Sequence, residues 1–322
     1  MKSEFEFIEN IRRRYNLSKI GDDCAVLPKD SKTDLVITTD LLVEDIDFRL
    51  DWTTPEFLGH KALAVSLSDV AAMGAKPVWA MLSIGVPQKI WKTDFVEKFY
   101  DGWFALAKKY SVQLVGGDVS KTPDKIVIDS IVAGEIKKGK AVLRSGAKVG
   151  DLIFVTGELG GAAAGLQLLE KGEKHEKSKY KNLLLKQLKP NPQTEVGRIL
   201  GAKNLATSMI DLSDGLTADL NHVCRESKTG AKLFPDKIPD QIDLEKFQSV
   251  FSLSEMIEFL LYSGEDYELL FTINPKKKIQ VENALKKHKI SLIGEVTASV
   301  GIIELIHKNR TEILQPKGFR HF

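Results

Sequence analysis

Several aspartates in this chain stand where an ionised side chain is unfavourable. Asp69 lies in the run of residues 55–74, on a helical stripe whose other members are Leu58, Ala62, Val65 and Ala72, all apolar. A lone carboxylate on such a face costs free energy unless a partner charge or a metal ion compensates it. The alternative is a helix that is apolar nearly all round, with Asp69 near its C-terminal end and in reach of water. We favour a functional role because other aspartates share the anomaly.

These other aspartates lie at the ends of expected strands or near the start of the chain. We expect Asp40 to end the strand of residues 35–40, and Asp118 to end the strand that begins at residue 112 and runs through two glycines. Each alone is a common turn residue or helix cap, and Asp214 could simply cap the helix that follows it. Together they offer oxygen ligands without His or Cys, a set that suits Mg²⁺, which proteins bind through carboxylates and nucleotide phosphates. The remaining members of the set are Asp22, Asp23 and Asp211.

A nucleotide site also needs positive charge and free backbone N–H groups. Arg144 lies in a glycine-bearing loop between the two halves, and it could reach a phosphate or be a surface arginine. Residues 134–141, GEIKKGKA, nearly match a P-loop, but Ala141 replaces the Ser or Thr that holds Mg²⁺, so we interpret the segment as a hairpin turn. The GxxGG of residues 157–161 leads from a strand into a helix and could bind phosphate or serve only close packing.

The elements that must position these residues alternate between strands and helices. In the first half we expect strands at 35–40, 78–86, 112–116 and 126–136, with helices at 55–74 and 94–110. The second half contains a strand from about residue 150, a helix at 160–172, an exposed connection at 172–181, two short helices, a strand at 206–210, a helix from about 217, a strand within 263–273, a helix at 275–289, a strand at 290–296 and a terminal hairpin. This alternation indicates an α/β or α+β protein of two domains, residues 1–140 and 141–322.

The composition excludes several classes of protein. Hydrophobic residues make up 43% and charged residues 28% of the 322 residues, and the net charge is only +2, which disfavours nucleic-acid binding. We find no apolar run long enough to span a bilayer and no signal peptide at the N-terminus, so we expect no membrane partner. Cys24 and Cys224 do not form a metal-type pair, and we expect two buried thiols in a reducing cytoplasm.

Eight motifs together carry a resemblance to a known family. In chain order they are GDDCAVL, TTDLLVEDIDF, KALAVSLSDVAAMGAKP, QLVGGDVS, LRSGAKVGD, MIDLSDGL, SGEDYELLFT and KGFRHF. They resemble the ordered motifs of the thiamine-monophosphate kinases, within the aminoimidazole-ribonucleotide-synthetase superfamily, over about residues 4–322. One motif differs from the family pattern TTDxLVEGxHF, because Asp45 replaces the glycine and Asp47 replaces the histidine.

The resemblance implies a two-domain homodimer, with an N-terminal domain for ATP, Mg²⁺ and dimerisation and a C-terminal α/β domain. It implies in-line transfer of a phosphoryl group from the co-substrate ATP to thiamine monophosphate, assisted by several Mg²⁺ ions, with Asp69, Asp118 and Asp214 as the catalytic carboxylates. The implied Mg²⁺ positions are Asp23, Thr38, Thr39, Asp40, Asp69, Asp118, Asp211 and Asp214. The implied nucleotide contacts are Gly117, Asp118, Arg144, Ser213 and Tyr100. The implied thiamine pocket contains Asp47, Glu265 and Phe319.

Two other functions stay open at this point. Another enzyme of the superfamily, such as a selenophosphate synthetase or a purine-pathway synthetase, would share the common motifs. The selenium enzyme needs a reactive cysteine, and the candidate Cys24 stands in an apolar, strand-like segment. A non-catalytic regulator that binds Mg-nucleotide would bind ATP without releasing ADP when thiamine monophosphate is added.

Overall fold

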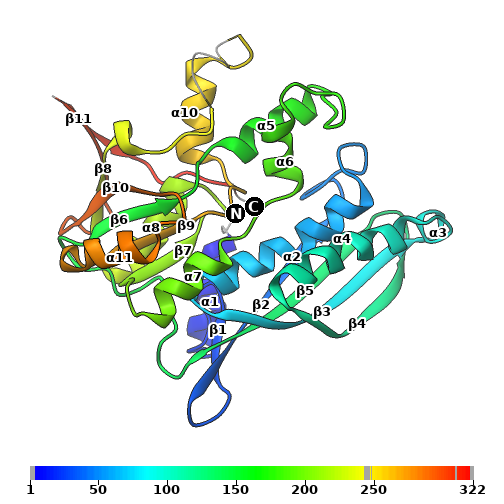
Figure 1. Cartoon of the computed structure of the whole chain (residues 1–322), viewed down its shortest axis with the longest axis horizontal. Helices are drawn as coiled ribbons and strands as arrows, with labels where there is room; N and C mark the ends of the chain where they lie inside the picture. The colour runs from blue at the N-terminus through cyan, green and yellow to red at the C-terminus, as the bar shows by residue number, and fades with distance from the viewer. Residues whose placement is uncertain (1–3, 243–246, 248, 309, 320–322) are drawn as a thin grey trace.

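The strands of the chain form two separate sheets, one in each half. The structure, a computed structural model, describes residues 4–242, 247, 249–308 and 310–319 (Figure 1). The first sheet has five strands in the order β1-β2-β5-β3-β4, and the second has seven in the order β12-β11-β8-β10-β6-β9-β7. This confirms the expected α/β (α+β) architecture. The expected domain boundary between residues 140 and 141 falls between the last strand of the first sheet and the first strand of the second, and stays a prediction.

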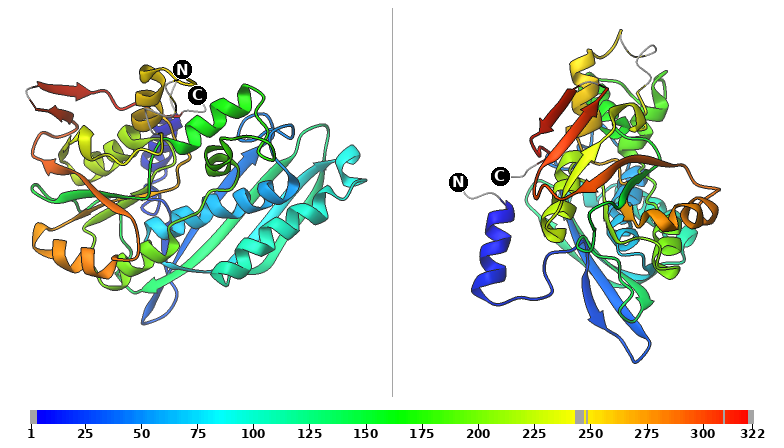
Figure 2. Two further views of the ribbon diagram at one scale, coloured as in Figure 1. Left: turned by 45° about the horizontal axis from the view of Figure 1, so that its top comes forward. Right: turned by 90° about the vertical axis from the view of Figure 1, so that its left-hand side faces the viewer.

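The first half contains the elements that the sequence predicts, together with two helices, α1 and α3, and the short strand β1, which it does not. Its helices and strands are α1 (Glu4–Arg14), β1 (Ala25–Pro28), β2 (Thr33–Val43), α2 (Pro55–Ala72), β3 (Lys76–Pro87), α3 (Gln88–Trp91), α4 (Phe95–Tyr110), β4 (Gln113–Thr122) and β5 (Val127–Lys137). Figure 2 shows α2 and α4 lying along one face of the five-stranded sheet. Their buried side chains form one core with the strands beneath them, including Leu58, Leu82, Phe99, Trp103 and Ile128.

The second half contains the seven-stranded sheet and the remaining described helices. Its bounds are β6 (Leu152–Thr156), α5 (Gly161–Glu170), α6 (Lys181–Leu188), α7 (Thr194–Ala202), β7 (Ser208–Asp211), α8 (Leu216–Ser227), β8 (Gly230–Leu233), η1 (Pro235–Lys237), α10 (Leu253–Tyr262), β9 (Leu269–Ile273), η2 (Pro275–Lys277), α11 (Lys278–Ala284), β10 (Ile290–Thr297), β11 (Ile303–His307) and β12 (Arg310–Leu314). The terminal hairpin is confirmed as β11 and β12, whereas the helix expected at 275–289 is shorter. None of the described helices is both long and apolar enough to cross a membrane.

The central helix is α2, which touches both halves of the molecule. The Thr54 side chain caps it by accepting from the Phe57 N–H at 3.3 Å, and Pro55 occupies its first turn. The helix packs on β2, β3 and β5 of its own half and on α6, α7 and β7 of the other. It is therefore buried nearly all round, as the alternative interpretation of its sequence stated.

Two of the expected strand ends are wrong. The strand β2 continues past Asp40 to Val43, and β4 continues past Asp118 to Thr122. Both continuations are held by pairing with neighbouring strands, since Asp40 stands opposite Ser130 on β5 and Asp118 stands opposite Ser83 on β3. Both carboxylates therefore project from strands rather than from loops.

The segment that resembles a P-loop is a turn, but it is not a hairpin. The Lys138 N–H donates to the Lys32 carbonyl at 2.9 Å, and the Gly139 N–H donates to the Asp34 carboxylate at 2.7 Å. The chain then leaves the sheet, because the next strand, β6, belongs to the second sheet. No helix opens here to present N–H groups to a phosphate, so the rejection of a P-loop is confirmed.

Candidate active site

Three carboxylates from distant parts of the sequence meet where the two halves join. Asp23 precedes β1, Asp69 lies on α2 and Asp211 ends β7, and each offers an oxygen within 4.8 Å of the other two. The Oδ2 atoms of Asp23 and Asp211 are buried and have no hydrogen-bond partner. Buried acceptors without partners are rare, and a bound cation would satisfy both oxygens.

Burial and mutual repulsion disfavour the ionised forms of these groups. Burial, followed by the charges of Asp40, Asp211 and Asp23, raises the pKa of Asp69 well above its ordinary value. Burial and the Asp23 charge raise the pKa of Asp211 to about 8. Burial also raises the pKa of Asp40 to about 6, although the hydrogen bond from Ser66 lowers it in part. The cluster is thus strongly unfavourable when it is ionised without a cation.

Hydroxyl groups on neighbouring elements orient the carboxylates of this cluster. Ser66 on α2 donates to Asp40 Oδ2 at 2.6 Å, and Thr38 on β2 donates to Asp69 Oδ2. The ligand set contains only oxygen, the donor that Mg²⁺ prefers. Together with the two unpartnered oxygens, this set fits Mg²⁺ bound by Asp23, Asp69 and Asp211, with Asp40 on the adjoining strand.

Alternation along β2 separates Thr39 from this cluster. Thr38 and Asp40 both bond to residues of α2, so they lie on the covered face of the sheet. Thr39 points to the opposite face and donates to Asp129 Oδ1 at 2.7 Å. Within one chain the Thr39 side chain therefore does not join the Asp23, Asp69 and Asp211 group.

Three further predicted residues lie away from the cluster. Gly117 and Asp118 are on the edge strand β4, which is separated from β2 by β5 and β3. Three inter-strand steps amount to about 14 Å, too far for Asp118 and Asp40 of one chain to share an ion. Tyr100 is half-buried on α4, where its ring contacts those of Phe99 and Phe104.

Arg144 reaches the cluster from the loop between the halves. Its Nη2 lies 2.7 Å from Asp23 Oδ1, and its backbone N–H donates to Asp22 Oδ1 at 2.7 Å. Burial alone would lower the pKa of the guanidinium, but the charge of Asp23 raises it above its ordinary value. Arg144 thus compensates part of the negative charge of the carboxylates. A phosphate group that enters the site would compete with Asp23 for the guanidinium.

A cavity of about 590 Å³ opens beside the cluster, between the two halves. Its wall brings together all three residues predicted for the thiamine pocket, one predicted nucleotide contact and two predicted metal positions, from four separate segments. Phe319 is 51% exposed, and its backbone N–H donates to the Asp214 carbonyl at 3.1 Å. This hydrogen bond holds the C-terminal tail beside the loop that contains Asp214. The predicted residues that line the cavity are Asp40, Asp47, Ser213, Asp214, Glu265 and Phe319.

The loop that carries Asp211 and Asp214 is held by a residue that sequence reasoning missed. Asp214 does not cap α8. Instead, the carboxylate of Asp219 accepts from the backbone N–H groups of Asp214 at 3.2 Å and Gly215 at 3.0 Å. Asp219 is an ordinary acidic residue in the first turn of a helix, so its sequence position carries no signal of this role.

The departure from the family motif at residues 45 and 47 has a structural basis. Asp45 takes the left-handed conformation, with φ of 72°, where the family pattern has glycine, and it forms an ion pair with Lys125. Aspartate tolerates this region better than most residues. The Asp47 carboxylate accepts from the Val43 N–H at 2.8 Å and lines the cavity, so the changed residue stands at the expected position.

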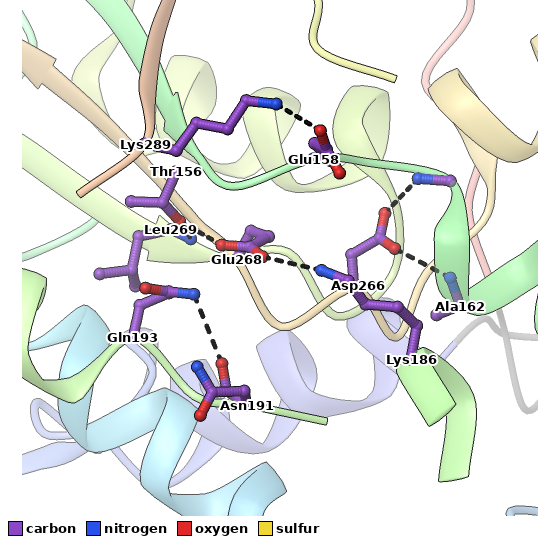
Figure 3. A network of polar contacts seen from close by, with 11 residues as sticks. Thr156, Glu158, Ala162, Lys186, Asn191, Gln193, Asp266, Glu268, Leu269 and Lys289 are labelled. Carbon is purple, nitrogen blue, oxygen red and sulfur yellow. Dashed lines mark hydrogen bonds and ion pairs between the residues drawn. The ribbon is translucent and has the colours of Figure 1, made fainter. Parts of the chain in front are cut away.

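The glycine-rich helix start at residues 157–161 is already occupied by a carboxylate (Figure 3). Asp266 accepts from the backbone N–H of Gly160 at 2.7 Å and of Ala162 at 3.2 Å, at the N-terminus of α5. Burial raises the pKa of Asp266 to about 7, and these two hydrogen bonds oppose that shift. Two donors that a phosphate could have used are bound within the protein, which favours close packing as the role of this motif.

Comparisons with known proteins agree over nearly the whole chain. Residues 21–136 match the AIR synthase related protein N-terminal domain, and residues 148–306 match the corresponding C-terminal domain. The chain is 39% identical to a thiamine-monophosphate kinase of Buchnera aphidicola (subspecies Schizaphis graminum), covering 99% of each chain, and 36% identical to that of Bacillus subtilis, covering 94% and 93%. A solved structure named "AaThiL complexed with AMPPCP and TMP" aligns with a TM-score of 0.87 at 32% identity, covering 99% of this chain and 97% of that one.

Asp69 and Asp118 differ in burial within one chain, and this difference predicts effects of different size on stability. Asp69→Asn removes a charge from the repelling cluster, so the metal-free protein should melt about 2–4 °C higher, equivalent to about 1 kcal/mol. Asp118→Asn changes a side chain that is exposed within one chain, on an edge strand, and should shift the melting temperature less than Asp69→Asn does, by about 1 °C. Differential scanning calorimetry without metal measures both. A lower melting temperature for Asp69→Asn would contradict the repulsion argument.

The raised pKa values also predict how stability depends on pH. Asp40 and Asp211 have folded-state pKa values of about 6 and about 8, above the ordinary value of 3.8, so the folded state holds more protons than the unfolded state between those limits. Stability contributed by these groups is therefore lost as pH rises from about 4, to about 6 for Asp40 and to about 8 for Asp211. Added Mg²⁺ should raise the melting temperature more at pH 8 than at pH 5. Asp211→Asn should flatten both trends, and an unchanged pH slope in that variant would argue against the assignment.

Proposed function

The chain belongs to the thiamine-monophosphate kinase family of AIR synthase related proteins, and we propose that it phosphorylates thiamine monophosphate to thiamine diphosphate with ATP. One observation carries this proposal. The repelling carboxylate cluster adjoins a cavity that holds Asp40 and Asp214 together with Glu265 and Phe319. A single cavity thus offers ligands for metal-bound phosphates and a wall for an aromatic acceptor. The relative whose structure is named with AMPPCP and TMP supports the same pair of substrates.

The residues of the site divide the work of the reaction. The carboxylates of Asp23, Asp40, Asp69, Asp211 and Asp214 would hold Mg²⁺, which screens the charge of the phosphate groups when it is bound. The acceptor phosphate is already ionised at neutral pH, so the transfer needs no general base, and the described residues that line the cavity include no histidine. The chain's contribution is to align donor and acceptor for in-line attack.

The remaining predicted residues would bind the two substrates. We assign Arg144 and Ser213 to the phosphates of ATP, because Arg144 already lies at the cluster and Ser213 lines the cavity. We assign Asp47, Glu265 and Phe319 to thiamine monophosphate. The exposed ring of Phe319 offers a face to the cationic thiazolium, an attraction of about 0.5–2 kcal/mol.

Two unpaired strand edges support a homodimer. In the described residues β1 pairs with β2 only at Asp34–Ile37, so the edge of β2 beyond Ile37 is open, and the outer edge of β4 is open as well. Apolar side chains on the uncovered face and on β4 are exposed, with Leu41 at 60%, Met81 at 39%, Val115 at 52% and Val119 at 50%. Pairing β2 of each copy with β4 of the other would close a barrel, remove both edges and bury these side chains.

The same pairing would complete the metal site. It would bring the partner subunit's Asp118 and Gly117 alongside Thr39 and Asp40, although these residues lie about 14 Å apart within one chain. The site residues on β4, including the nearby Tyr100 on α4, would then serve the active site of the other subunit. We accordingly assign dimerisation and Mg-ATP binding to residues 1–140 and the α/β domain to residues 141–322. Cys24 and Cys224, both free and buried, fit activity in a reducing cytoplasm.

The proposed activity is tested by steady-state ADP release with a panel of acceptors. We expect ADP release with ATP, Mg²⁺ and thiamine monophosphate, and the product should be thiamine diphosphate by chromatography. Phe319→Ala should raise the KM for thiamine monophosphate by about three- to tenfold and leave that for ATP unchanged, consistent with a lost cation–π contact. A protein that binds ATP but releases no ADP with any acceptor would instead be a regulator.

The shared site is tested by mixing two inactive variants, Asp69→Asn and Asp118→Asn. If Asp118 acts across the interface, a mixed dimer contains one site with both substitutions and one site with neither. Random exchange of equal amounts should then restore about a quarter of the wild-type activity, because half of the dimers are mixed and half of their sites are intact.

The matched control pairs Asp69→Asn with Asp211→Asn, whose carboxylates meet within one chain. Each site of that mixed dimer keeps one substitution, so no activity should return. Native mass spectrometry establishes that mixed dimers have formed. If they form and the Asp69→Asn and Asp118→Asn mixture stays inactive, the cross-subunit site is wrong.

A further inference from the structure

The helix α2 brings a second buried charge to the cavity, at Lys61. The Lys61 side chain is 6% exposed, lines the cavity and places its Nζ 2.6 Å from Oε1 of Glu265. Lys61 precedes Asp69 by eight residues, or about 12 Å along the helix axis, so it lies well away from the carboxylate cluster. A buried ammonium that lost its partner would be strongly unfavourable, and this ties Lys61 to Glu265.

Glu265 is held in one conformation from several directions. Gln187 on α6 donates through Nε2 to Oε2 of Glu265, while Lys61 contacts Oε1. The Glu265 backbone adopts φ of 65°, in the left-handed region, and its N–H donates to the Ser213 carbonyl at 2.9 Å. A Cβ at Gly264 would lie 1.9 Å from that same carbonyl, so only glycine lets this segment pack so closely against Ser213. A conformation held this firmly at a cavity wall is typical of a functional carboxylate.

Gln187 also leaves one polar atom without a partner. An ionised Glu265 can only accept hydrogen bonds, so the amide of Gln187 must turn its Nε2 toward the carboxylate. The Gln187 Oε1 is then buried and has no hydrogen-bond partner. The cavity wall at this end thus carries an ammonium donor, a carboxylate acceptor and an amide oxygen with unused acceptor capacity.

We propose that Lys61 and Gln187 are positioning residues that hold Glu265 for the aminopyrimidine ring of the acceptor. This inference rests on the proposed function. An aminopyrimidine presents an amino donor beside ring-nitrogen acceptors, which is the complement of a carboxylate flanked by donors. The thiazolium and phosphate carry no such amino group. The Lys61, Glu265 and Gln187 cluster therefore selects an acceptor with an aminopyrimidine over a thiazole phosphate that lacks one.

The first test separates acceptor binding from turnover. Lys61→Met should raise the KM for thiamine monophosphate at least about tenfold, while kcat and the KM for ATP change by less than about threefold. Lys61→Arg keeps the charge and should keep the acceptor KM within about threefold. Wild-type protein should prefer thiamine monophosphate over 5-(2-hydroxyethyl)-4-methylthiazole phosphate, and Lys61→Met should lose most of this preference. An unchanged acceptor KM in Lys61→Met would overturn the proposal.

The second test asks whether Lys61 acts through Glu265. In a double-mutant cycle, Lys61→Met should add no further rise in acceptor KM when it is combined with Glu265→Gln. Independent effects that multiply in the double variant would overturn the positioning role.

The matched control is Lys186→Met, because Lys186 pairs with the buried Glu268 at 3.4 Å (Figure 3) and neither residue lines the cavity. It should lower the melting temperature without changing the acceptor KM, and an equal rise in that KM would overturn the proposal by showing a general structural effect. Calorimetry on every variant establishes that it is folded. Failure of the proposed function would appear separately, as wild-type protein that releases no ADP with thiamine monophosphate.

Discussion

The repulsion among the buried carboxylates is the constraint on which the rest of the site depends. The pKa values of Asp69 and Asp211 are raised because burial and neighbouring charges disfavour ionisation. One oxygen of Asp211, Oδ2, also has no hydrogen-bond partner. Arg144 compensates only Asp23 by direct contact. The cluster draws residues from both halves, so a cation that relieves the repulsion would also bind the halves to each other.

The fold meets this constraint through a single central helix. Two glycines allow α2 and α4 to pack closely, since a Cβ at Gly59 would lie 1.9 Å from the Phe99 carbonyl and a Cβ at Gly102 would lie 1.9 Å from the Glu56 carbonyl. The helix is thereby enclosed between α4, the first sheet and the second half of the molecule. A helix fixed on all sides holds Asp69 and Lys61 at constant spacing, which preorganises the site for metal and acceptor together.

The sequence identified the site residues better than it placed them in space. Asp69 was predictable because a carboxylate on an apolar stripe needs a partner, and Lys61 on the same helix carries the same anomaly, so the same rule could have found it. The side of the sheet that Thr39 faces also follows from alternation along a strand. The distance between Asp40 and Asp118 does not, because it depends on the order of strands, which is set by non-local pairing that no local pattern encodes. Gln187 is a polar residue on a short amphipathic helix and gives no signal until its partner is known.

The two charged groups on α2 differ in how they are balanced, and this difference matches the two ends of the proposed acceptor. Lys61 is neutralised by Glu265 within the protein, so that end of the cavity can bind an uncharged aromatic ring through hydrogen bonds. At the other end, the carboxylates of Asp23, Asp69 and Asp211 meet, and among the described residues Arg144 forms an ion pair with Asp23 alone of the three. A bare phosphate would be repelled there. The site therefore favours ligands that bring positive charge with them, which the thiazolium of the acceptor and the metal ions on the phosphates both do.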